Sequence, residues 1–269
     1  MESRTARWLI RFGSVVALLF LYIPLVIVVL YAFNDSIGQK WPISHFTTKY
    51  FSLAWHNTDL REALINSLLI ASVATVLALL LGSAAAFAVH RYRFFGRNSL
   101  SLMLVLPITL PGIVTAIALN SSFNTFGISL GLLTIMIGHA TFCIVVVYNN
   151  VIARLRRTPT SLVEASQDLG ADSWQTFRFV TFPQLRSALI AGALLAFALS
   201  FDEVIVTTFT AGSTETLPIW ILTNLSRPRN LPIVNVVAVA AVILSIIPVY
   251  IAQRLSADPI AQTVGAAAQ

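Results

Sequence analysis

Charged side chains are scarce in this chain: Asp, Glu, Lys and Arg make up 10% of its 269 residues. A water-soluble domain carries about 25%, because water must solvate its surface. The chain therefore cannot cover a water-exposed surface of its size, which excludes a soluble enzyme. Hydrophobic residues instead reach 57% and the mean hydropathy is +0.82. These values indicate an integral membrane protein whose main partner is the lipid bilayer.

Cysteine is nearly absent as well, and the single one, Cys143, lies inside an apolar run. The sequence thus offers neither a disulfide framework nor a thiolate metal site. It contains no G-x-x-x-x-G-K-[ST] string, no nucleophile elbow and no zinc-protease motif, so we expect no catalytic residue, no metal and no cofactor. The net charge of +6 does not indicate nucleic-acid binding, because the basic residues form short clusters between apolar runs.

Six long apolar segments predict an all-α membrane protein. A bilayer core of about 30 Å requires around 20 residues of helix. The predicted spans cover residues 10–33, 63–89, 99–121, 131–153, 187–210 and 231–253. The stretch 98–153 has no formal charge but is too long for one span, so we place a hairpin turn at Asn120–Gly131. We expect residues 1–269 to form a single transmembrane domain, since no internal repeat divides the chain.

The distribution of Lys and Arg predicts the orientation. With the N-terminus inside, twelve of these residues fall on the cytoplasmic side and five outside. The positive-inside rule then places both termini in the cytoplasm. The first apolar run is too long for the apolar region of a signal peptide, so we interpret it as a retained helix. The longest cytoplasmic connection is the loop 154–186.

This loop is patterned. Ser161–Glu164 has the spacing of a capping box, which predicts a helix over Leu162–Leu169 that ends at Gly170. Asp172–Gln175 predicts the start of a second short helix, which Pro183 should end. The sequence therefore predicts two short capped helices on the cytoplasmic face.

The string from Glu164 to Pro183 resembles the EAA signature of permease subunits of binding-protein-dependent ABC importers. That signature reads E-A-A, three residues, G, nine residues, I-x-L-P. The loop keeps this spacing, with Ser166, Val180 and Phe182 as conservative departures. The resemblance implies the type I importer permease fold and a coupling helix that docks on a cytoplasmic ATPase. The coupling residues it implies are Glu164, Ala165, Ser166, Gly170 and Pro183.

Two further strings, 106–115 and 198–207, look closest to the spermidine/putrescine branch of that family. Proline and glycine inside the third span should break its helix, which is tolerated only against protein or a water-filled cavity. Asp202 and Glu203 are the only carboxylates within a predicted span, and each costs about 2.5 kcal/mol or more at a helix centre. The resulting candidates for a cation pathway are Asp202, Glu203, Phe201, Pro111 and Gly112.

Glu203 and His139 leave alternatives open. Ser200–Glu203 is also a capping-box string, so Glu203 either lines the pathway or caps a broken half-helix. His139 in the fourth span is either a proton relay or a neutral side chain bonded to a facing helix. The outer loop 34–61 is the expected docking surface for a solute-binding protein.

The resemblance implies a permease subunit in a bacterial inner membrane that carries a polyamine or similar small cationic solute inward. It implies a second, related permease, two ATPase subunits that bind the ATP, and an extracytoplasmic solute-binding protein. One alternative is a stand-alone proton-coupled carrier with Asp202, Glu203 and His139 as its relay. Another is an ABC permease for iron, sulfate or thiamine.

Overall fold

The computed structural model describes residues 4–256, and within this range the regular structure is helical. The all-α prediction is therefore confirmed. The described residues form two compact units. The first contains the chain up to residue 61 together with 220–244, and the second contains 62–219 and the residues after 244.

The first unit contains helix α1 (Arg4–Ala32), the short α2 (Lys49–His56), most of α11 (Leu217–Leu225), the 3₁₀ turn η2 (Pro228–Asn230) and the first part of α12 (Leu231–Ser256). Its loop after α1 is folded back on itself. Lys49 forms an ion pair with Asp35, and the Tyr50 hydroxyl donates to the Asp35 carbonyl at 3.1 Å. The exposed Lys49 ammonium has a raised pKa, chiefly because of its hydrogen bond to Asp35.

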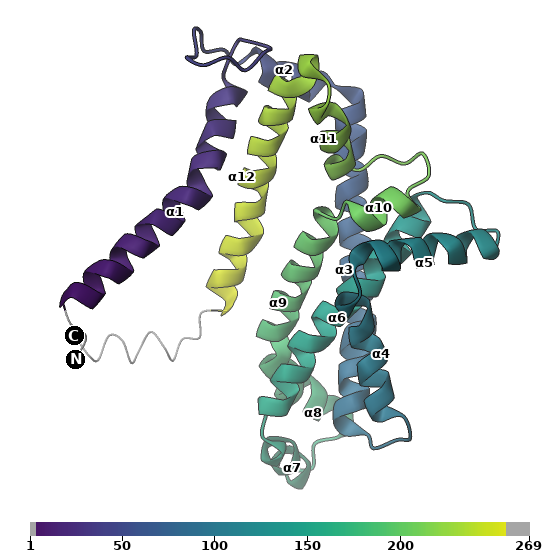
Figure 1. Ribbon diagram of the computed structural model, residues 1–269. Helices are drawn as coiled ribbons and strands as arrows, with labels where there is room; N and C mark the ends of the chain where they lie inside the picture. Colours follow the sequence, from purple (N-terminus) through teal and green to yellow (C-terminus); the bar gives the residue numbers. More distant parts are fainter. Residues whose placement is uncertain (1–3, 257–269) are drawn as a thin grey trace. The chain divides into compact units, whose positions relative to one another are not determined.

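The second unit is built around α6 (Leu132–Arg157), which packs between α3 (Thr58–Arg91) and α9 (Phe182–Phe201) (Figure 1). Glycine permits the close approach of α3 to α6: a Cβ atom on Gly82 would lie 2.8 Å from the Ile144 carbonyl oxygen. Small residues at such contacts let helix backbones meet in a bilayer, where packing rather than water exclusion holds helices together. The buried core consequently follows α6, from Ile135 to Leu155.

Four described helices are long and apolar enough to cross a bilayer: Thr5–Ala32, Thr58–Arg91, Leu132–Arg157 and the helical run Ser173–Phe201. A fifth span results if α4 (Arg97–Thr109) and α5 (Gly112–Thr125) are counted together. The predicted sixth span coincides with α12, part of whose side chains lie outside the described residues. The count of six and the orientation of the termini stay predictions.

The third predicted span is not straight: α4 and α5 are bent by 106°. The break falls at Leu110 and Pro111, where the sequence predicts it. The hairpin turn is shorter than predicted, because α5 continues through Asn120 to Thr125. Polar side chains there stabilise the helix instead of ending it; the Asn124 amide, for example, donates to Asn120 Oδ1 at 2.8 Å.

Candidate functional site

In the loop 154–186, which the sequence predicts to be cytoplasmic, the first separate helix is α7 (Thr160–Asp168). The capping box predicted at Ser161–Glu164 is wrong: Pro159 occupies the N-cap position and no side chain caps the helix. Because the helix starts at Thr160, Ser161 already lies inside its first turn and cannot serve as the cap. The predicted end of the helix is confirmed at Gly170, whose φ of +84° is the left-handed conformation that glycine adopts most easily.

Two hydrogen bonds close this end of α7. The Gly170 amide donates to the Gln167 carbonyl at 2.8 Å, and the Ala171 amide donates to the Ser166 carbonyl at 3.1 Å. This pair is the Schellman motif, which satisfies the last carbonyls of a helix. The chain is thus turned sharply toward the following helix.

That next helix, α8 (Ser173–Thr176), starts as predicted. The Asp172 carboxylate accepts from the amides of Trp174 and Gln175, both at 2.8 Å, and the Gln175 side chain accepts from the Asp172 amide at 3.0 Å. The prediction that Pro183 ends this helix is wrong. A π-helical turn, η1 (Phe177–Thr181), leads into α9, and Pro183 lies in the first turn of α9.

The π turn explains how the proline is tolerated. Its wider hydrogen bonding, in which the Phe182 amide donates to the Phe177 carbonyl five residues back, changes the helical register just before Pro183. The missing proline amide then falls where the π turn has already interrupted the regular bonding of each amide to the carbonyl four residues back. The predicted second short helix is therefore the first turns of the run Ser173–Phe201.

Helix α7 is attached to this run by a polar contact, and an aromatic contact attaches the run itself to α3. Ser166 Oγ lies 3.0 Å from Thr176 Oγ1, and the Trp174 ring stacks on Phe177, which also contacts Phe87 of α3 edge-on. The half-buried Ser166 thus faces the protein. The remaining residues of the EAA string, Glu164, Ala165, Gly170 and Pro183, are exposed.

The fifth predicted span, 187–210, is broken at its acidic pair. Helix α9 ends at Phe201, Asp202 is its C-cap, and α10 (Ile205–Thr210) starts after a short gap. Glu203 Oε1 accepts the Val206 amide at 3.0 Å, so this carboxylate caps the start of α10. The cap differs from the predicted box, because Ser200 lies in the last turn of α9 and does not start a helix.

His139 connects the two sides of this break. It is buried in α6, with Nδ1 2.8 Å from Ser200 Oγ and Nε2 2.9 Å from Thr207 Oγ1. The Thr207 hydroxyl uses its hydrogen to donate to the Glu203 carbonyl at 2.8 Å, so it must accept from His139 Nε2–H. In the neutral imidazole Nδ1 is then the acceptor for the Ser200 hydroxyl.

We name the set His139, Ser200 and Thr207 the histidine clamp. Sequence reasoning identified the histidine but missed both hydroxyl partners. Serine and threonine are common in membrane helices and usually bond their own backbone, as Thr208 does with the Val204 carbonyl. Nothing in the sequence distinguishes Thr207 from Thr208, because only the fold determines which of them faces α6.

The break in the third span lies beside the break in the fifth. Helices α5 and α10 pack together (Figure 1). A Cβ atom on Gly112 would lie 4.0 Å from Ile205 Cδ1, and the Asn120 amide donates to the Phe209 carbonyl at 2.6 Å. The structure therefore brings the predicted Pro111–Gly112 break close to the break at Asp202 and Glu203, which we call the acidic break.

Asp202 and Phe201 complete this region. The Asp202 side chain is exposed, and it follows the last turn of α9, where the carbonyl end of the helix adds partial negative charge. The Phe201 ring stacks on Phe197 at 6.0 Å. A carboxylate, a helix carboxyl end and aromatic rings together suit an organic ammonium ion. Within residues 4–256 no group of three or more His, Cys, Asp or Glu side chains could hold a metal.

Comparison with a family model and with individual relatives leads to the same family. Residues 78–260 match the family described as binding-protein-dependent transport system inner membrane component. The spermidine/putrescine transport system permease protein PotC of Escherichia coli (strain K12) is 37% identical, over 93% of this chain and 95% of the relative. The putrescine transport system permease protein PotI of the same strain is 32% identical, over 81% and 80%.

Solved structures show the same fold at lower identity. A bacterial ABC transporter that imports the acidic polysaccharide alginate matches with a TM-score of 0.71 at 16% identity, over 94% of this chain and 98% of the other. The MetNI methionine ABC transporter, in inward-facing conformations, matches with a TM-score of 0.63 at 18% identity, over 76% and 96%.

Proposed function

The chain belongs to the family of binding-protein-dependent transport system inner membrane components, and we propose that it is the permease subunit of an ATP-driven importer. Its cargo is putrescine, spermidine or a similar small cationic solute. The observation that carries this proposal is the extended similarity to two permeases whose names state spermidine and putrescine transport. The low-identity structural neighbours contribute only the fold.

The acidic break supplies the chemistry for a cationic cargo. The exposed Asp202 carboxylate and the carboxyl end of α9 attract an ammonium group that has lost part of its water. The Phe201 face adds a cation–π contact, and the break at Pro111 and Gly112 opens backbone carbonyls nearby. Glu203 serves mainly as the cap of α10, because one of its oxygens is committed to the Val206 amide.

The exposed part of the EAA string is the proposed contact with an ATPase. Glu164, Ala165 and Gly170 are available to a partner, whereas Ser166 positions α7 through Thr176. A complete importer then needs two ATPase subunits, which bind the ATP, and a second permease related to this chain. An extracytoplasmic solute-binding protein docks on the outer loop 34–61. The complex lies in the bacterial inner membrane, and residues 1–269 of this chain form one permease domain.

A stand-alone proton-coupled carrier finds less support. Both ring nitrogens of His139 are occupied by the hydroxyls of Ser200 and Thr207, and neither contacts a carboxylate. A proton relay through Asp202, Glu203 and His139 would need such a contact or a bridging water. Iron, sulfate and thiamine, the alternative cargoes of an ABC permease, are tested by the same transport assay.

The test is uptake of radiolabelled putrescine and spermidine by vesicles that contain the assembled complex. We expect ATP-dependent uptake, and we expect Asp202→Asn to reduce it about tenfold to hundredfold, since a hydrogen bond to a charged group contributes about 1.5–3 kcal/mol. Glu62→Gln, which removes an exposed carboxylate from α3 outside the loop 34–61, is the matched control. Wild-type uptake by Asp202→Asn would refute the role of Asp202, and no polyamine uptake by the wild type would refute the cargo.

A further inference from the structure

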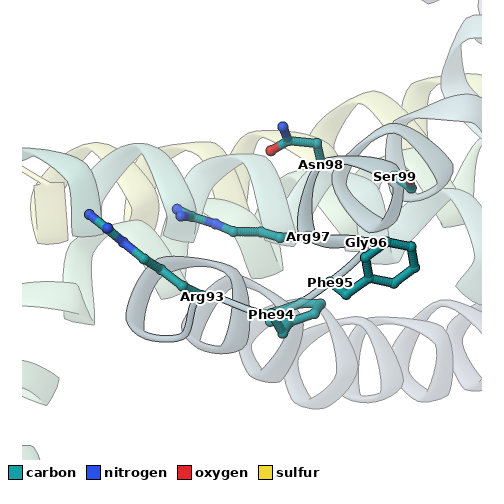
Figure 2. A pocket seen from close by; sticks show the side chains of 7 residues that line it. All are labelled: Arg93, Phe94, Phe95, Gly96, Arg97, Asn98 and Ser99. Atoms are coloured by element: carbon teal, nitrogen blue, oxygen red, sulfur yellow. The ribbon is translucent and has the colours of Figure 1, made fainter.

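The loop between α3 and α4 lines an open cavity of about 510 Å³ (Figure 2). Its lining residues are Arg93, Phe94, Phe95, Gly96, Arg97, Asn98 and Ser99. Figure 2 shows the Arg93 and Arg97 side chains extending in the same direction. Because the cavity is wide open and one loop lines it, a ligand held there keeps part of its surface outside the protein.

The two arginines have no carboxylate to neutralise them. The sequence contains no Asp or Glu between Glu62 and Glu164. Among the described residues neither arginine forms an ion pair, in contrast to Lys49, which pairs with Asp35 in the other unit. Arginine guanidinium groups bind phosphate through paired hydrogen bonds and keep their charge at any physiological pH. The cavity is therefore suited to a phosphate-bearing anion.

Apolar side chains adjoin these charges. Phe95 is fully exposed, and on α4, which starts at the cavity, Leu102 and Met103 are 68% and 70% exposed. A soluble anion would gain nothing from this surface, whereas the acyl chains of a lipid would cover it. The same end of the unit contains the arginine-rich end of α6 and the coupling helix α7 (Figure 1). The positive-inside rule predicts that this end is cytoplasmic.

We propose that this cavity binds the headgroup of an anionic phospholipid of the cytoplasmic leaflet, such as phosphatidylglycerol. Arg93 and Arg97 hold the headgroup phosphate, and Phe95 lies at the boundary with the acyl chains. The chains extend along the exposed apolar side of α4. Basic pockets at the cytoplasmic ends of transmembrane helices are suited to anionic lipids in this way. The inference does not depend on the cargo proposed above.

The experiment is native mass spectrometry of the purified full chain, loaded with equal amounts of phosphatidylglycerol and phosphatidylethanolamine. We expect the wild type to retain phosphatidylglycerol preferentially. The double variant Arg93→Gln/Arg97→Gln should bind it about thirtyfold more weakly, since each basic residue near an anionic surface contributes about fivefold in affinity. Both side chains lie at a loop and a helix start, so circular dichroism should show unchanged helix content.

The matched control is Arg7→Gln/Arg11→Gln, which removes the same charge from exposed positions of α1, away from the cavity residues in sequence. It should retain phosphatidylglycerol like the wild type. Phosphatidylglycerol retention by the cavity variant, or equal loss in the control, would overturn the proposal.

Two further measurements distinguish other ligands. Millimolar inorganic phosphate should not displace the lipid, and full displacement would indicate a site for a soluble anion instead. In the assembled complex the cavity variant should keep its ATPase. If it loses the ATPase while binding lipid normally, the loop is a protein contact and the proposal fails.

Discussion

The histidine clamp predicts a measurable coupling between α6 and α10. Replacing His139 by Leu keeps a side chain of similar size but removes the hydrogen bonds to Ser200 and Thr207, at 2.8 and 2.9 Å. Hydrogen bonds between membrane helices contribute about 0.6 kcal/mol on average and up to about 1.7. Two such bonds predict a loss of about 1–3 kcal/mol in the free energy of unfolding.

A double-mutant cycle isolates the interaction. We expect the effects of His139→Leu and Thr207→Val to be non-additive by about 0.6–1.7 kcal/mol, because the pair shares one bond. Thr208→Val is the matched control: its hydroxyl bonds only the Val204 carbonyl of its own helix. The cycle with Thr208→Val should therefore be additive.

The assay is equilibrium unfolding of the full chain in mixed micelles with increasing denaturing detergent, followed by circular dichroism. Additive effects of His139→Leu and Thr207→Val, or equal coupling with Thr208→Val, would refute the clamp. The clamp also predicts that His139→Leu lowers polyamine uptake when the complex is present at equal amounts. The reason is that the break at Asp202 and Glu203 then loses the buried hydrogen bonds that hold α9 and α10 to α6. His139→Gln, which can still donate to Thr207, should recover part of that uptake.

Two glycines give further predictions. Gly82→Ala should lower the free energy of unfolding by about 1–3 kcal/mol, because its Cβ would lie 2.8 Å from the Ile144 carbonyl oxygen. Gly13→Ala, whose Cβ would have nothing within 4 Å, is the control in the same unfolding assay. Equal stability of both variants would contradict the close α3–α6 contact. Gly170→Leu has free space but a φ of +84°, so it should strain the end of α7 by about 1–2 kcal/mol and reduce ATPase co-purification and uptake without preventing insertion. Normal ATPase binding and uptake by Gly170→Leu would argue against α7 as the coupling helix.

Much of the helical architecture follows from the sequence, because hydropathy and helix-breaking residues act locally. The break at Pro111, the left-handed Gly170 and the cap at Asp172 were predictable, since each depends on residues within one or two turns. The coupling residues came from the resemblance to the EAA signature and not from such local signals, and their contact with an ATPase stays a prediction.

The errors share a physical cause: a local signal was outweighed by its surroundings. Ser161 has a capping spacing, but Pro159 starts the helix earlier. Pro183 normally ends a helix, yet the π turn before it lets the helix continue. The partners of His139 could not be predicted at all, because they depend on how α6 packs against the broken fifth span.

The π turn at Phe177–Thr181 has a mechanical consequence. Without it, Pro183 would lie in the interior of a regular α-helix, where proline kinks or breaks the helix. With it, one helical rod of 29 residues runs from the Asp172 cap to Phe201, a length of about 43 Å. A helix cannot be shortened without breaking its hydrogen bonds. Helix α7 is attached to the first turn of this rod, so a displacement or rotation applied there moves the whole rod and thereby Asp202 at its other end.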